Sequence, residues 1–457
     1  MRLRRSCCLV AMVVAGMLLA SRSASAQADR TSRMYRGLFG SDNRSAVSKH
    51  QLDFTLGVNG AADDGYSEPA SPDGDPTVIN KHFEELYFAG AKLAYTRRGR
   101  SVQFGAASGV SFPYYSVNPD YSSLAGNASG DVAYSSGRTS FGGSASYRYS
   151  PFYSLSIDPG SLPSYPDTPI NPSGPYDYAS ALSRNHALNG SVSFNRRLSR
   201  PTSVSVGYNV GTMLFVDDGR STFDQSVRLS ASRIMSRSTS LNGGYGYSQT
   251  DAKAVTSAPS TTTRWHDVDV GAGYSRPSPR GQQFSASASI GTSLFDVGQD
   301  QTQSLDQRLR WRWSAEASRS IHGNWAASAS YSRSLQYVGG LLQPVWADQV
   351  NAQAGGLIGQ RVSLSFGAGY STGDYLVGST AGYDAYSGSV RSQFALTSYM
   401  QLNVQYIYYR YDFPPGFDLP PGMQPLLGRQ RVQIGAGVWL PLVRAGRAPE
   451  PRPTVNQ

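Results

Sequence analysis

The sequence predicts an all-β fold: a transmembrane, antiparallel, up-and-down β-barrel of about 18 strands, with 16 as the alternative count. Three observations lead to this prediction. The N-terminus resembles an export leader, no later segment is apolar enough for a membrane helix, and apolar and polar residues alternate over most of the chain.

The first 26 residues have the layout of a cleaved secretory signal. Arg2, Arg4 and Arg5 precede the apolar run CLVAMVVAGMLLA, and a small-residue cleavage site follows at Ala24 to Ala26. The only two cysteines, at positions 7 and 8, lie inside this leader. The exported chain is therefore expected to contain neither a disulfide nor a cysteine-ligated metal.

No later segment contains the roughly 18 consecutive apolar residues that a membrane helix requires. An exported soluble protein and a membrane β-barrel both remain, and residue alternation distinguishes them. In QLDFTLGVN, residues 51–59, the apolar residues Leu52, Phe54, Leu56 and Val58 fall on one face of a strand. This is the pattern of a strand with one face toward lipid and the other toward a polar lumen.

Eighteen segments share this alternation. They lie at 51–59, 83–96, 101–112, 124–134, 139–153, 186–195, 202–216, 223–234, 239–248, 265–275, 282–295, 307–318, 325–336, 348–358, 361–371, 383–396, 401–409 and 430–440.

The connections between these segments alternate in length, with eight short turns and nine longer loops. The short turns are at 97–100, 135–139, 195–201, 236–239, 276–281, 320–324, 359–361 and 397–400. The longer loops include 59–80, 155–180, 250–262, 371–382 and 411–428. This arrangement places both chain ends on the short-turn side, as in outer-membrane barrels with short periplasmic turns.

We therefore divide the chain into four parts. Residues 1–26 form the signal peptide, 27–48 a short periplasmic segment, 49–442 the transmembrane barrel, and 443–457 a disordered periplasmic tail rich in proline and arginine.

The alternation also selects charged residues that face the lumen. The candidate pore-lining residues are Arg308, Arg310, Arg312, Glu316, Asp267, Asp269, Lys92, Arg228 and Arg391. Arginines opposite acids would create a transverse field that selects solutes. Alternatively, the same residues pair across neighbouring strands and only fill space. The sequence leaves both interpretations open.

Other chemistries receive little support. We expect no enzyme activity, because none of the five histidines has a serine two residues later and HDVD, 266–269, is an isolated acid-histidine motif. We expect no cofactor and no metal site; the acidic loop 63–75 could hold calcium but is better explained as solvated. The net charge of +10 falls to +6 without the leader, with no basic block, so no nucleic-acid partner is expected.

Hairpins such as RRLSRPTSVSVGYNV, 196–210, resemble those of porin-like bacterial outer-membrane barrels, some of which are encoded with exopolysaccharide export systems. The resemblance covers about 49–442. Gln433, Gly435, Val438 and Leu440 match the signal that such barrels present to the outer-membrane assembly machinery. Those barrels usually end there on an aromatic residue, whereas this chain continues to Gln457.

The resulting functional expectation is a channel in the bacterial outer membrane that passes polar solutes or an exported polysaccharide. Its expected partners are outer-membrane lipid and the assembly machinery, with a periplasmic export partner as an open alternative. A non-conducting structural or surface-interaction barrel and a soluble exported β-rich binding protein are the competing hypotheses. The sequence indicates no oligomeric state.

Overall fold

The computed structural model describes residues 48–67, 81–116, 123–154, 179–217, 219–253, 260–277, 283–299, 308–321, 325–336, 345–359, 361–375, 382–414 and 426–447. These residues form one 18-stranded sheet. The predicted signal peptide and most of the predicted longer loops lie outside the described residues.

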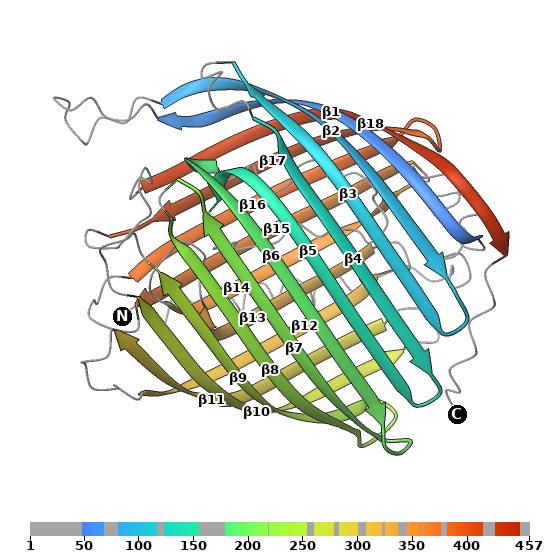
Figure 1. Ribbon diagram of the computed structural model, residues 1–457, viewed down its shortest axis with the longest axis vertical. Helices are drawn as coiled ribbons and strands as arrows, with labels where there is room; N and C mark the ends of the chain where they lie inside the picture. Colours follow the sequence, from blue (N-terminus) through green and yellow to red (C-terminus); the bar gives the residue numbers. More distant parts are fainter. Residues whose placement is uncertain are drawn as a thin grey trace.

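The strands follow one another around the sheet in chain order (Figure 1). They are β1 (Ser48–Ser67), β2 (Lys81–Arg98), β3 (Val102–Tyr115), β4 (Ala125–Ser136), β5 (Thr139–Ser154), β6 (Ala179–Arg197), β7 (Thr202–Phe215), β8 (Ser221–Ile234), β9 (Thr239–Lys253), β10 (Thr261–Pro277), β11 (Gln283–Gln299), β12 (Arg308–Ile321), β13 (Trp325–Gln336), β14 (Val345–Ile358), β15 (Val362–Tyr375), β16 (Gly382–Ala395), β17 (Met400–Asp412) and β18 (Leu426–Arg447).

The sheet closes because β1 pairs antiparallel with both β2 and β18. The β1–β18 ladder runs from Ser48 opposite Arg447 to Asp63 opposite Arg431. Figure 1 shows these two strands, coloured blue and red, side by side. The predicted fold class and the count of 18 strands are therefore confirmed, and both ends of the barrel sequence lie at the short-turn end.

The barrel sequence is slightly longer than expected. β1 begins at Ser48, and β18 continues to Arg447. Residues 443–447, which the sequence placed in the tail, thus pair with β1. A bulge between Leu52 and Asp53 shifts the register by one residue on the β18 side and lets this ladder continue past Pro441.

The short turns lie where the alternation places them, and three of them share one hydrogen-bond pattern. In the turns before β7, β9 and β17, two successive backbone N–H groups donate to the carbonyl of the residue that opens the next strand: Thr202, Thr239 or Met400. Between β4 and β5 only two residues intervene, and Gly137 adopts φ 54°, the left-handed conformation that a two-residue hairpin needs.

One expectation about the end of the barrel opposite the short turns is wrong. The β7–β8 connection, expected to be one of the longer loops, spans only 216–220. Arg184 of β6 holds it by donating from Nε and Nη2 to Asp217 Oδ1, at 2.8 and 2.6 Å. These hydrogen bonds also lower the pKa of the Asp217 carboxyl.

The two faces of the wall differ in chemistry. Along β17, Leu402, Val404 and Tyr406 point outward and are 38–39% exposed, whereas Asn403 and Gln405 point inward. Most of the other strands repeat this arrangement with outward Leu, Val, Ile, Phe and Tyr. A closed sheet with an apolar exterior satisfies its backbone groups internally, which is what the hydrocarbon core of a bilayer demands.

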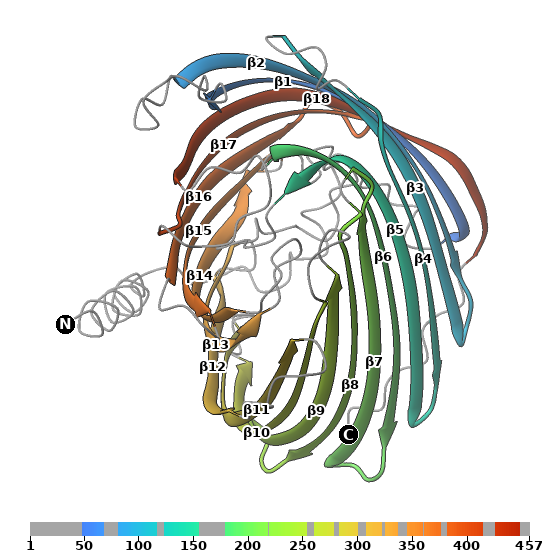
Figure 2. The ribbon, with the colours of Figure 1, turned by 60° about the vertical axis from the view of Figure 1, so that its left-hand side comes forward.

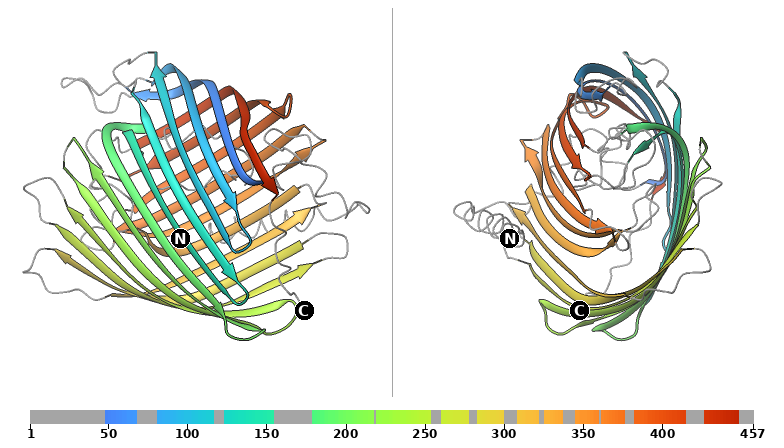
Figure 3. Two further views of the ribbon diagram at one scale, coloured as in Figure 1. Left: turned by 45° about the vertical axis from the view of Figure 1, so that its right-hand side comes forward. Right: turned by 90° about the vertical axis from the view of Figure 1, so that its left-hand side faces the viewer.

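The barrel is not a regular cylinder. The outer ends of β5 and β6 curve toward the interior (Figures 2 and 3). Two register shifts lie in this part of the ladder, between Ser150 and Phe152 and between Tyr153 and Ser154. Bulges bend a strand and increase its twist, so they account for the curvature. Within the described part of the chain, no helix is long and apolar enough to cross a membrane.

A new charge is expected to destabilise the barrel more on the outward face than on the inward face. Ile290→Arg places a guanidinium on the outward face, where Ile290 is 51% exposed, and is expected to cost about 2–4 kcal/mol of stability near the bilayer midplane. Urea unfolding in lipid vesicles, followed by tryptophan fluorescence, measures this loss. Ser289→Arg, on the inward face of the same strand, is the control and should cost much less; equal losses would contradict the assignment of faces.

Candidate functional site

The inner wall of β8 to β12 carries most of the charged residues that the sequence singled out. Asp267 and Asp269 lie on the inward face of β10, between two arginines from other strands. Arg228 of β8 donates from Nη2 to Asp269 Oδ1 at 2.6 Å. Arg312 of β12 places Nη1 2.8 Å from Asp267 Oδ2. The structure therefore brings four of the nine candidate residues together as two ion pairs.

Glycines make these contacts geometrically feasible. Each arginine must cross one strand to reach β10. Arg228 crosses β9 beside Gly244, where an added Cβ would lie 2.7 Å from its Nη2. Arg312 faces Gly291 of β11, which in turn faces Asp269. A larger residue at Gly244 would meet the guanidinium, so the glycine leaves the space in which Arg228 crosses the strand.

The carboxylates are less accessible than the guanidinium groups. The Asp269 side chain is 5% exposed, whereas that of Arg228 is 44% exposed. Asp267 also accepts a 2.5 Å hydrogen bond from Ser293 Oγ. The lumen therefore meets the positive partners of these pairs more than the negative ones.

The remaining arginines of β12 differ from Arg312. Arg310 lies over the Trp346 ring, 5.7 Å from its centroid, in a cation–π contact. Arg308 is the first residue of β12, and its side chain lies outside the described residues. Arg312 thus contacts an aspartate of β10, whereas Arg310 contacts a tryptophan of β14.

Three further candidates on the inner face stand apart from these ion pairs. Lys92 of β2 faces inward and is exposed, opposite Thr55 of β1. Arg391 of β16 is buried, at 7% exposure, opposite Gln405 of β17. Glu316 is exposed on β12, opposite Ser287 of β11. None of these three belongs to the β10 ion pairs.

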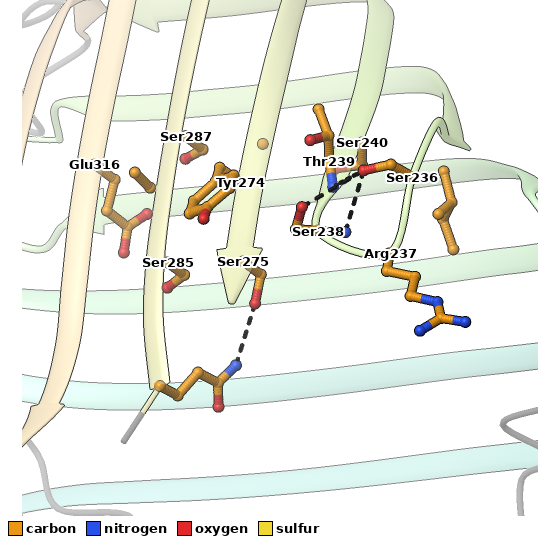
Figure 4. A pocket seen from close by; sticks show the side chains of 14 residues that line it. Ser236, Arg237, Ser238, Thr239, Ser240, Tyr274, Ser275, Ser285, Ser287 and Glu316 are labelled. Atoms are coloured by element: carbon orange, nitrogen blue, oxygen red, sulfur yellow. Dashed lines mark hydrogen bonds between the residues drawn. The ribbon is translucent and has the colours of Figure 1, made fainter. Parts of the chain in front are cut away.

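Glu316 lines a cavity of about 510 Å³ at the short-turn end of β8 to β12 (Figure 4). Most of its polar lining is serine, including Ser285 and Ser287 on β11. Gln283 closes one side by donating to Ser275 Oγ at 3.4 Å. The cavity is thus a hydroxyl-lined recess of the inner wall with one carboxylate.

Two ion pairs that the sequence did not predict join β1 to β18. Arg429 lies 3.0 Å from Asp63, and both side chains are almost completely buried. Arg444 contacts Asp53 near the short-turn end. The inward parity of Arg429 was a usable signal, but the expected strand began at 430 and so omitted it. These pairs join the first and last strands and hold the closure of the barrel.

At the outer end of the lumen, apolar and aromatic side chains from strands that are not neighbours pack together. Phe215 of β7 packs in one cluster with residues of β14, β16, β17 and β18, none of which neighbours β7 in the sheet. The cluster comprises Phe215, Val345, Ala347, Tyr383, Ala385, Ile407, Tyr409, Tyr411, Phe413 and Leu427. The barrel is therefore crossed by side-chain packing at this end.

The proposed assembly signal lies on β18 with its residues divided between the faces. Gln433 and Gly435 point inward, while Val438 and Leu440 point outward. A Cβ at Gly435 would lie 1.7 Å from Asn59 Oδ1 and 2.9 Å from Asn403 Oδ1. A side chain at this position would displace these two amides, so packing favours glycine there independently of the assembly machinery.

The residues of the HDVD motif, 266–269, also point to opposite faces of the wall. His266 points outward and shares a hydrogen bond of 2.8 Å with the Tyr245 hydroxyl, whereas Asp267 points inward to Arg312. His50 and His186 are likewise bonded to tyrosines on the outward face. Among the described residues, no group of three or more His, Cys, Asp or Glu side chains could hold a metal ion.

No protein-family model and no curated protein matches the sequence. Solved structures that resemble the fold include Pseudomonas aeruginosa OpdQ, at 10% identity and TM-score 0.43, over 86% of this chain and 98% of that one. Pseudomonas aeruginosa OprD has 10% identity and TM-score 0.41, over 89% and 100%. The ferric citrate transporter FecA has 10% identity and TM-score 0.44, over 85% and 79%. These likenesses are too distant to assign a solute.

Gly435 can be explained by close packing or by recognition by the assembly machinery. The two explanations predict different results when it is replaced. If packing requires the glycine, Gly435→Ala should lose about 1–3 kcal/mol of stability by overpacking, and Asn59→Ala in the same chain should restore most of it. Urea unfolding of the refolded barrel measures both. Gly428→Ala is the control, because no atom lies within 4 Å of its added Cβ. Failure of Asn59→Ala to rescue would reject the packing explanation.

Proposed function

We propose that the chain is a channel of the bacterial outer membrane that passes small polar solutes. The observation behind this proposal is that one closed wall has an apolar outer face and a polar inner face. Apolar side chains such as Val268 and Trp311 are exposed outside, while Asp267, Asp269 and Arg312 lie on the inner side of the same two strands, β10 and β12. A barrel with this distribution suits lipid outside and water inside.

The competing hypothesis of a soluble binding protein fits this wall poorly. Large apolar side chains are exposed on the outward face of nearly every strand, including Leu56, Phe104, Leu188 and Ile434. Soluble monomers rarely expose a contiguous apolar surface larger than a few hundred Å². We therefore assign the outward face to lipid, and the export leader expected at residues 1–26 directs the barrel to the outer membrane.

In the proposed mechanism, solutes diffuse along the inner wall past the ion pairs of β10. Because the guanidinium groups of Arg228 and Arg312 are more exposed than the carboxylates they contact, a passing solute meets positive charge first. This arrangement favours anionic or zwitterionic solutes. Lys92 adds a further positive group on the opposite part of the sheet.

Other expected features remain proposals. Outer-membrane lipid and the assembly machinery are the partners that a barrel of this kind requires, and we infer no catalytic role. An exported polysaccharide and its periplasmic export partner are finer alternatives. The described residues offer no observation that favours a polysaccharide over a small solute.

Planar-bilayer recording tests the channel function directly. Purified barrel, with folding confirmed by heat-modifiable migration on gels, is expected to produce discrete current steps in KCl. A folded and inserted barrel that passes no current under any applied voltage would refute the channel and favour the non-conducting structural barrel.

Removing the arginines of β12 is expected to change the ion selectivity of the channel. Replacing Arg308, Arg310 and Arg312 with Gln removes positive charge and leaves Asp267 without its Arg312 partner, so the reversal potential in a KCl gradient should shift toward cations. At about 4 Å in water each charge contributes roughly 1 kcal/mol, or on the order of a fivefold change in ion partitioning. Arg410→Gln, on the outward face of β17, is the control; an unchanged reversal potential in the triple variant would discard these arginines as selectivity residues.

A further inference from the structure

The cavity at the short-turn end of β8 to β12 follows one transverse row of the sheet. Five residues that pair across neighbouring strands form this row and line the cavity: Ile234, Ser240, Gly273, Ser287 and Glu316. The row faces the lumen, because Glu316 lies four residues along β12 from the inward Arg312. It spans four strand spacings, or roughly 19 Å. Since only serine and glycine stand between its two ends, the inner wall is recessed there.

Two hydroxyls of this row point into the recess. Inward serines on adjacent strands bond to each other elsewhere, as Ser289 does to Ser314 at 2.7 Å. Here Gly273 separates Ser240 from Ser287, and within the described part of the chain neither serine has a hydrogen-bond partner. A Cβ on Gly273 would lie only 2.8 Å from Ser240 Oγ, so this hydroxyl leans over the glycine. The space above Gly273 is therefore flanked by hydroxyls that can both donate and accept.

Glu316 places a carboxylate at the β12 end of the row. Its side chain is exposed, and it forms no ion pair or hydrogen bond with any residue that the structure describes. The next inward cation along β12, Arg312, contacts Asp267 instead. An ionised carboxylate only accepts hydrogen bonds, so it suits a solute that presents O–H or N–H groups. Two neighbouring hydroxyls of one solute can donate to its two oxygens.

The other borders of the recess are of two kinds. On the short-turn side, Ser275 Oγ accepts from Gln283 at 3.4 Å, and Ser285 is bonded to Ser318 at 2.6 Å. At the β8 end of the row, Ile234 offers an apolar side chain. Hydroxyls, one carboxylate and one apolar contact together fit a carbon chain that bears hydroxyl groups. The volume of about 510 Å³ lies in the range of small-molecule sites.

We propose that this recess binds a polyhydroxylated solute that is neutral or carries an amine, such as a sugar alcohol or its amino derivative. The solute exchanges hydrogen bonds with Ser240 and Ser287, donates to Glu316 and rests its carbon chain on Ile234. The inference deepens the proposed function and rests on it for access of the solute to the lumen. The ion pairs of β10 present positive charge and Glu316 negative charge, so the recess adds a separate selection step.

Three six-carbon polyols that differ at one end test the site: neutral sorbitol, its cationic analogue glucamine and its anionic analogue gluconate. Saturation-transfer NMR titration of the refolded barrel in lauryldimethylamine oxide measures the affinity for each and does not require conduction. Because a unit charge beside a carboxylate changes affinity about fivefold in water, glucamine should bind about fivefold more tightly than sorbitol, and gluconate about fivefold more weakly.

Two pairs of variants locate the binding. Glu316→Gln should bring the three affinities together, whereas Asp131→Asn, which removes an exposed inward carboxylate of β4, should keep their order. Ser287→Leu fills the recess and should abolish binding of all three polyols. Ser330→Leu is its control, because Ser330 pairs with Glu316 from β13 and does not line the cavity.

Planar-bilayer current of the same preparations separates the site from the channel. A conducting barrel that binds none of the polyols overturns the site and leaves the channel function standing. Binding without the charge order, an order that persists in Glu316→Gln, or equal losses in the two leucine variants also overturns it. Binding in the expected order by a barrel that passes no current supports the site and refutes the channel.

Discussion

The structure depends on one constraint: no edge of the sheet may remain unpaired against hydrocarbon. β1 meets this constraint by pairing with β18 over almost its whole length, from Ser48 to Asp63. The buried Arg429–Asp63 pair and the Arg444–Asp53 pair join the same two strands. Closure then fixes which face of every strand is inside, and so decides which charged side chains can form a lumen.

Inside the barrel, arginines reach their partners because glycines let them cross a strand. Arg228 passes Gly244 and Arg312 faces Gly291, and both end on aspartates of β10. Ion-pair formation and solute selection, the two interpretations open at the sequence level, are therefore compatible. The aspartates are buried in the wall, while the arginines that hold them remain accessible from the lumen.

The wall is less regular at the boundary between β12 and β13. The β12–β13 ladder ends with Trp313 opposite Arg333, and Val345 and Ala347 of β14 pack in one cluster with Phe215 and the tyrosines of β16 and β17. The packing of these side chains narrows the lumen.

The sequence by itself determined the fold class, the 18 strands, the position of the short turns and the alternation of faces along most strands, because period-two alternation and turn residues are local properties. Only the tertiary structure decided which charges meet, since Arg228 and Asp269 are 41 residues apart and their contact depends on closure and on the glycines between them. It also decided that Trp346 faces inward against its alternation. That placement depends on packing against Phe295 of β11, which no local pattern encodes.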